Sequence, residues 1–106
     1  MTIEKTRWVT VLEEHELEAG DVTGIVCGNR QIAIYDLPDG LYATSGLCTH
    51  AGARLCDGYL DGYVIECPLH QGGFDIRSGK ALYAPVTRGL RTYPVRCVEG
   101  KVQLLL

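Results

Sequence analysis

The sequence predicts an all-β protein made of small antiparallel sheets, on three observations. Apolar and polar residues alternate over short runs, turn-forming residues separate those runs, and no helical apolar period lasts for three turns. The chain has 106 residues, of which 46% are hydrophobic, with 13 glycines and four prolines. This length and composition predict one turn-rich domain over residues 1–106, with a modest core.

In the first half, the acidic segment 13–18 can form at most one helical turn. Gly28 and Asn29 are expected to close a hairpin, because both residue types tolerate positive φ. Segment 38–40 (Pro-Asp-Gly) should turn the chain again. The strands are expected at residues 8–11, 22–27, 30–35 and 41–44, with Ile32 and Ile34 on one face of the third and Ala33 and Tyr35 on the other.

The second half repeats this pattern of strands and turns. Asp61-Gly62 is expected to close a hairpin over 59–66, and Ser78-Gly79 a hairpin between 74–77 and 80–82. Residues 91–98 should pair with 102–106 across 99–101, and Pro94 predicts an edge position or a bulge there.

Two short arms carry the chemistry. Cys48 is followed by His50, 16 residues intervene, and Cys67 is then followed by His70. Thiolates and neutral imidazoles bind borderline-soft metals, so the arms indicate either a zinc site or the end ligands of a two-iron cluster. Each arm is mixed, which favours a cluster whose two ends differ. The hairpin over 59–66 returns the chain, so that the arms can meet.

The arms resemble the two cluster-binding boxes of Rieske proteins, and the chain is similar to the ferredoxins of bacterial aromatic-ring dioxygenases, especially the naphthalene type. The stretches that carry this resemblance are 41–44, 57–60, 65–71, 79–82 and 84–87. It implies the Rieske fold, with a cluster-binding subdomain of two hairpin loops at about 45–86. It also implies one [2Fe-2S] cluster, bound by Cys48, His50, Cys67 and His70.

The resemblance implies a non-catalytic carrier that passes single electrons from a flavin-containing, NAD(P)H-dependent reductase to a terminal oxygenase. The alternatives are a Rieske component of a nitrite reductase or monooxygenase, and a structural zinc module. The boxes lack the extra cysteines of respiratory Rieske proteins, with Ala53 and Leu69 in their places, and Gly72 and Phe74 replace hydroxyl donors. Fewer hydrogen bonds to the cluster predict a reduction potential near the lower end of the Rieske range.

Composition excludes some classes of protein. The net charge of −3 argues against nucleic-acid binding, no run approaches a membrane span, and residues 1–7 lack the apolar core of a secretory signal. We therefore expect a cytoplasmic protein, and a monomer is the default for a mobile electron carrier. Acids outnumber bases by 11 to four in residues 1–66, whereas bases outnumber acids by six to two in residues 67–106.

Other residues receive simpler interpretations. Cys27 and Cys97 are expected to be small core residues, Cys56 a spectator thiol and His15 a solvated side chain. Glycines 52, 58, 72 and 73 allow either close backbone approach to the cluster or ordinary loops. Leu69, Gln71 and Pro85 are expected to form a small, mostly apolar rim around the imidazole end of the cluster.

Overall fold

The computed structural model describes residues 7–50, 52–69 and 71–106 and confirms the all-β prediction. Its strands and 3-10 helices (η) are β1 (Trp8–Glu13), η1 (Glu14–Glu16), β2 (Val22–Cys27), β3 (Arg30–Leu37), β4 (Gly40–Ser45), η2 (Leu55–Asp57), β5 (Tyr59–Asp61), β6 (Val64–Glu66), β7 (Gly73–Asp75), β8 (Ala81–Tyr83), β9 (Thr92–Tyr93), β10 (Val95–Val98) and β11 (Lys101–Leu105).

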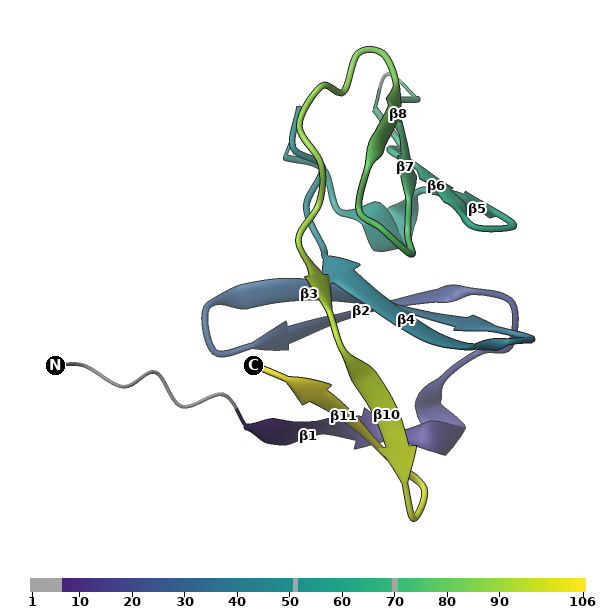
Figure 1. Ribbon diagram of the computed structural model, residues 1–106, viewed down its shortest axis with the longest axis vertical. Coiled ribbons are helices and arrows are strands. Elements are labelled where there is room, and N and C mark those ends of the chain that lie inside the picture. Colours follow the sequence, from purple (N-terminus) through teal and green to yellow (C-terminus); the bar gives the residue numbers. More distant parts are fainter. Residues whose placement is uncertain (1–6, 51, 70) are drawn as a thin grey trace, which may run out of the picture.

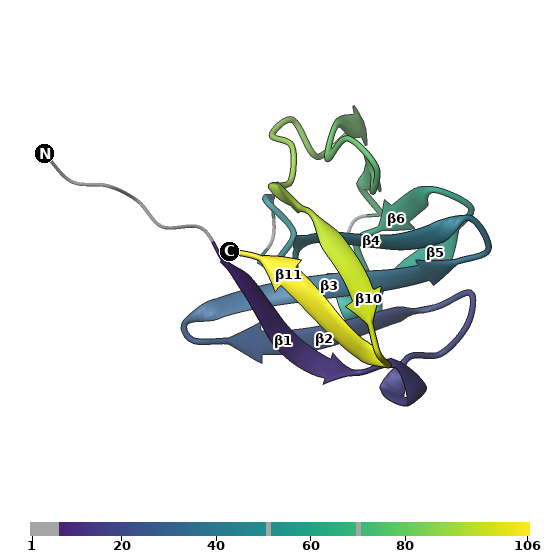
Figure 2. The same cartoon turned by 60° about the horizontal axis from the view of Figure 1, so that its bottom comes forward.

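The strands form three antiparallel sheets. Their orders are β1-β11-β10 in the first sheet, β2-β3-β4-β9 in the second and β5-β6-β7-β8 in the third. The second sheet lies between the other two, with the third sheet and its loops at one end (Figure 1). Figure 2 shows the first sheet lying across the face of the second.

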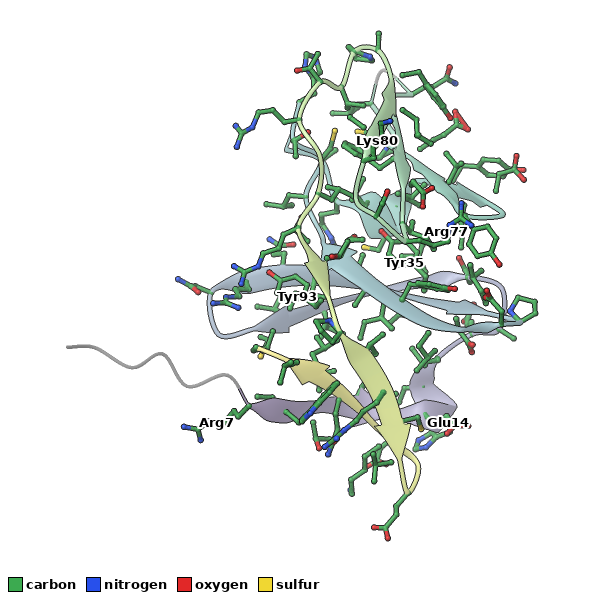
Figure 3. The ribbon with its side chains drawn as sticks, viewed as in Figure 1. Arg7, Glu14, Tyr35, Arg77, Lys80 and Tyr93 are labelled. Carbon is green, nitrogen blue, oxygen red and sulfur yellow. The ribbon has the colours of Figure 1, made fainter. Side chains whose placement is uncertain are left out.

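Strand β3 contributes to two separate cores, as its alternation predicts. Ile32 and Ile34 pack on one side with Val102 and Leu104. Ala33 and Tyr35 pack on the other side against the third sheet and its loops, in a cluster that includes Cys48, Leu55, Cys67 and Phe74. Tyr35 lies between the sheets in Figure 3, where its hydroxyl is 2.9 Å from Thr44 Oγ1. The middle strand of the molecule therefore has no solvent-facing side over residues 32–35.

Most of the predicted hairpins are present, with small shifts. The β2–β3 turn is Gly28-Asn29 as expected, but only Gly28 takes a positive φ, of 62°. Asp61 pairs with Val64, so the β5–β6 turn begins one residue later than predicted, at Gly62 with φ 58°. Glycine is suited to both positions because it has no Cβ to clash.

The predicted strand over 91–98 is two strands. β9 pairs with β4 in the second sheet and β10 pairs with β11 in the first, and Pro94 separates them. Proline has no N–H to donate, so the ladder is interrupted there and the chain changes sheets. The predicted strand over 74–77 likewise ends early, at Asp75, and a longer turn leads to β8.

The chain leaves the second sheet to form the third, and returns to the second, at one place. β4 and β9 are neighbours, and the N–H of Ser45 donates to the carbonyl of Arg91 at 2.8 Å. Everything between these residues, including both arms of the motif, is an insertion between two paired strands.

Candidate metal centre

The first arm lies on a tight loop, residues 47–54, called the first loop below. Leu47 bridges Arg54, the N–H of Cys48 donates to the carbonyl of Ala53 at 2.8 Å, and the N–H of Gly52 donates back to the carbonyl of Cys48 at 2.9 Å. These bonds turn Cys48 inward, where the residue is 3% exposed.

The second arm lies on the loop between β6 and β7, residues 67–72, called the second loop. The N–H of Cys67 donates to the carbonyl of Gly72 at 2.8 Å and closes this loop. Gln71 takes a positive φ of 58° within it. Cys67 is 1% exposed, so both thiols of the motif are buried.

The two buried thiols interact with one another. The pKa of the Cys67 thiol is raised, first because burial disfavours the thiolate and second because the thiol bonds to Cys48. The backbone N–H of Leu69 opposes this rise by donating to the Cys67 sulfur. The fold thus brings together two cysteines that are 19 positions apart, as the returning hairpin predicts.

Residues 84–90, called the third loop, hold the first two together. Thr49 Oγ1 donates to the carbonyl of Arg88 at 2.7 Å, and Gly72 lies against the buried side chain of Val86. The base of the third loop is fixed where the N–H of Leu90 donates to the carbonyl of Gly79 at 2.7 Å. All three loops lie at the same end of the molecule as the third sheet (Figure 1).

Close packing explains three of the four glycines near the arms. A Cβ on Gly58 would collide with the carbonyl of Glu66, on Gly72 with Val86, and on Gly73 with the ring of Tyr83. Gly52 has open space but a positive φ of 69°. These glycines are therefore needed for loop packing and backbone conformation.

The structure describes one of the two histidines of the motif. His50 is exposed on the first loop, two residues after Cys48. His70 lies outside the described residues. Within the described ranges, no three side chains of histidine, cysteine, aspartate or glutamate gather into one metal-binding group.

Asp39, in the turn between β3 and β4, connects the second sheet to the third. This connection was not predicted from the sequence. Its Oδ2 accepts from the hydroxyl of Tyr42 at 2.9 Å and from that of Tyr63 at 2.6 Å. These two bonds, Tyr63 first, lower the pKa of the carboxyl. The guanidinium of Arg77 lies 4.0 Å from the centroid of the Tyr63 ring, and Figure 3 shows Arg77 beneath the third sheet.

The remaining cysteines and His15 occupy ordinary positions. The prediction that Cys97 is a core residue is wrong, because it lies exposed on the edge strand β10, 2.7 Å from Glu14 Oε2. Cys27 is half-buried against the core that contains Ile32 and Ile34, and His15 is exposed as expected. Cys56 accepts from Arg54 at 3.2 Å and packs against Gly24 of β2.

The three residues of the expected rim are all at least partly exposed. Leu69 is 51% exposed, Gln71 is exposed and Pro85 is half-buried. A protein-bound iron–sulfur cluster needs deprotonated thiols in a place sheltered from water, and the donor chemistry of the Cys48–Cys67 pair fits it.

Residues 7–94 match the Rieske [2Fe-2S] domain family. The chain belongs to this family. The naphthalene 1,2-dioxygenase ferredoxin component of Pseudomonas aeruginosa is 46% identical over 90% of both chains. Among solved structures, the Sphingomonas yanoikuyae B1 ferredoxin is 33% identical, with a TM-score of 0.87 over 94% of this chain and 99% of that one. The complex of reduced oxygenase and oxidized ferredoxin in carbazole 1,9a-dioxygenase contains a chain 35% identical, with a TM-score of 0.85 over 92% of both.

Family membership decides between the metals that the sequence left open. The cofactor is a Rieske-type [2Fe-2S] cluster, and the alternative interpretation as a structural zinc module is wrong. The Rieske fold and the likeness to naphthalene dioxygenase ferredoxins are both confirmed. In the described part of the chain, no helix is long and apolar enough to cross a membrane.

Proposed function

We propose that Cys48, His50, Cys67 and His70 bind the cluster, with the two thiolates on one iron and the two imidazoles on the other. The observation that carries this proposal is the pairing of Cys48 and Cys67, each buried and each placed by its own hydrogen-bonded loop. Each histidine follows its cysteine closely in sequence, so each loop supplies one ligand of each kind.

When bound, the cluster accepts and returns one electron. The chain's own residues determine the surroundings in which this happens. The first and second loops bury the sulfurs and keep water from them, and the N–H of Leu69 donates to the Cys67 sulfur, where it favours negative charge. Thr49 and Val86 hold the three loops in register.

The protein then acts as an electron carrier, in agreement with the ferredoxin components that it resembles over nine-tenths of their length. It receives electrons from an NAD(P)H-dependent, flavin-containing reductase and passes them to the terminal oxygenase of an aromatic-ring hydroxylating dioxygenase. It is not itself the catalytic component. Residues 1–106 form a single domain with the cluster-binding part at about 45–86, working as a monomer in the cytoplasm.

Two experiments test this assignment. The purified protein should contain iron and inorganic sulfide in equal amounts, and alanine in place of His50 or His70 should abolish the visible absorbance of the cluster. His15→Ala serves as the matched control, because that exposed histidine lies in η1 at the other end of the molecule.

The second experiment mixes the ferredoxin with the reductase and oxygenase of a naphthalene 1,2-dioxygenase system. NADH-dependent oxygenation should depend on the added ferredoxin and should fail with the His50→Ala variant. Oxygenation that is equally fast without the ferredoxin would refute the carrier role, even if the cluster is present.

A further inference from the structure

A network of four side chains, called the latch below, lies at the boundary between the second and third sheets: Asp39, Tyr63, Asp75 and Arg77. The hydroxyl of Tyr63 donates to Asp39 Oδ2 at 2.6 Å. The guanidinium of Arg77 lies 4.0 Å from the centroid of the Tyr63 ring and donates to both carboxylate oxygens of Asp75, at 3.2 and 3.1 Å. The latch therefore joins three segments that are separated in the sequence.

The latch lies at the base of the β6–β7 hairpin, whose tip is the second loop. Val64, next to Tyr63, pairs with Asp75, and the N–H of Ile76 donates to the carbonyl of Tyr63 at 2.9 Å. From this base, β6 and β7 each run for only three residues before they reach the loop that begins at Cys67. A movement of the base is therefore transmitted to Cys67 through a short pair of hydrogen-bonded strands.

The latch gives the insertion a second polar attachment to the second sheet. The first attachment is the bond between Ser45, at the end of β4, and Arg91. Asp39 directly precedes the other end of β4. Figure 1 shows the β3–β4 and β5–β6 turns on the same side of the molecule, and Figure 3 places Arg77 on that side. The insertion is thus attached near both ends of one strand.

Charge strengthens the connection between the two sheets. The bond from Tyr63 lowers the pKa of Asp39 most, followed by the bond from Tyr42, and the nearby charge of Arg77 lowers it further. Asp39 is therefore ionised at neutral pH, and hydrogen bonds to an ionised acceptor are stronger than those between neutral groups. Tyr63 links Asp39 to Arg77, so the loss of its hydroxyl leaves Arg77 attached to the third sheet alone.

We propose that the latch holds the second loop closed and thereby determines how long the protein keeps its cluster. When the bond from Tyr63 to Asp39 breaks, the base of the hairpin separates from the second sheet and the loop opens more often. Cys67 is 1% exposed in the closed loop, and opening gives water and chelators access to its sulfur. This inference rests on the proposed binding of the cluster by Cys67.

Hydrogen exchange of the cluster-loaded protein, measured on peptides by mass spectrometry, tests the latch itself. Tyr63→Phe keeps the ring beside Arg77 and should raise exchange about threefold in segment 64–76, with no change in β3. Tyr42→Phe is the matched control, because it removes a hydroxyl from the same oxygen of Asp39, at 2.9 Å, but within the second sheet. Equal effects of the two variants on segment 64–76, or no effect of Tyr63→Phe, would overturn the proposal.

The rate at which EDTA removes the cluster at neutral pH, followed by visible absorbance, tests the connection to the metal centre. Chelator oxygens replace the thiolates on iron, and the thiolates take up protons from water. Tyr63→Phe and Asp39→Ala should each raise the rate about threefold, and the double variant should be no faster, because both changes break the same bond. Tyr42→Phe should match wild type. Faster exchange in segment 64–76 without faster loss of the cluster would show that the latch does not control retention.

Two further measurements separate the possible failures. The EPR spectrum and midpoint potential of Tyr63→Phe should equal those of wild type, because the latch acts by opening the loop and not on the closed metal centre; a change in either would overturn the proposal. If Cys67→Ala keeps the wild-type spectrum, the proposed ligand assignment is wrong and the latch inference fails with it. If Cys67→Ala loses the cluster but Tyr63→Phe keeps it as long as wild type does, only the latch inference is wrong.

Discussion

Replacing Gly72 by alanine tests how the second and third loops support the cluster. Gly72 has no positive φ, so alanine is compatible with its backbone. The new Cβ would, however, lie 2.5 Å from Val86 Cγ1 and 3.2 Å from Cγ2. Val86 is 5% exposed and β-branched, so it cannot simply turn aside. The substitution should therefore push the two loops apart.

The size of the effect follows from the kind of contact. Overpacking a buried site costs about 1 to 3 kcal/mol, and each kcal/mol lowers the melting temperature of a chain of this length by roughly 5 °C. Val86→Ala alone removes two buried methyl groups, which costs about 2 kcal/mol including the space left behind. In the double variant the new methyl group occupies part of the vacated space, so the cost should be about 1 kcal/mol or more below the sum of the single costs.

The assay is the melting temperature of the cluster-loaded protein at one fixed scan rate, together with the rate at which visible absorbance is lost on warming. A fixed rate is needed because cluster loss is irreversible. Gly52→Ala is the control, since it forces an L-residue to φ 69° in open space, and Val86→Ala should not rescue it. If Gly72→Ala behaves like wild type, or if the double variant shows purely additive losses, the packing argument is refuted.

Three further predictions concern the rest of the molecule. The midpoint potential should lie near the lower end of the range from about −150 to about +300 mV for Rieske centres, and a voltammetric value well above zero would contradict this. Because the pKa of Asp39 is lowered from 3.8, its bonds to Tyr42 and Tyr63 contribute fully above that pH and are lost as the pH falls through the lowered pKa. The melting temperature of Asp39→Asn should therefore fall less than that of wild type when the pH is lowered from neutral to acidic, as measured by circular dichroism. Cys56→Ser should keep the visible and EPR spectra of wild type, and a changed spectrum would make this thiol a ligand.

Local signals predicted most of the strands and the cysteine pair. The turn dipeptides specified the hairpins because glycine has conformational freedom that other residues lack, and the alternation in β3 specified its two faces. The returning β5–β6 hairpin explained how Cys48 and Cys67 meet. Each of these signals is contained within a few neighbouring residues.

Other features depend on contacts between distant segments and left no local signal. The bond from Tyr63 to Asp39 spans 24 positions, and the bond from Thr49 to the Arg88 carbonyl spans 39. Cys97 was expected in the core because free cysteine is among the most buried residue types, and residue type alone does not show on which face of a strand a side chain lies. The sheet change at Pro94 was foreseen only as an irregularity, because a missing N–H shows where a ladder stops and not where the chain goes next.

The meeting of Ser45 and Arg91 has an evolutionary consequence. One backbone hydrogen bond of 2.8 Å joins the two ends of the segment that lies between them. Because its ends are adjacent, this segment can be exchanged for another without moving β4 and β9. The replacement has to cover the face of the second sheet that includes Ala33 and Tyr35, which would otherwise face water. The first and second sheets thus form a scaffold that can accept a different cofactor-binding segment as a single insertion.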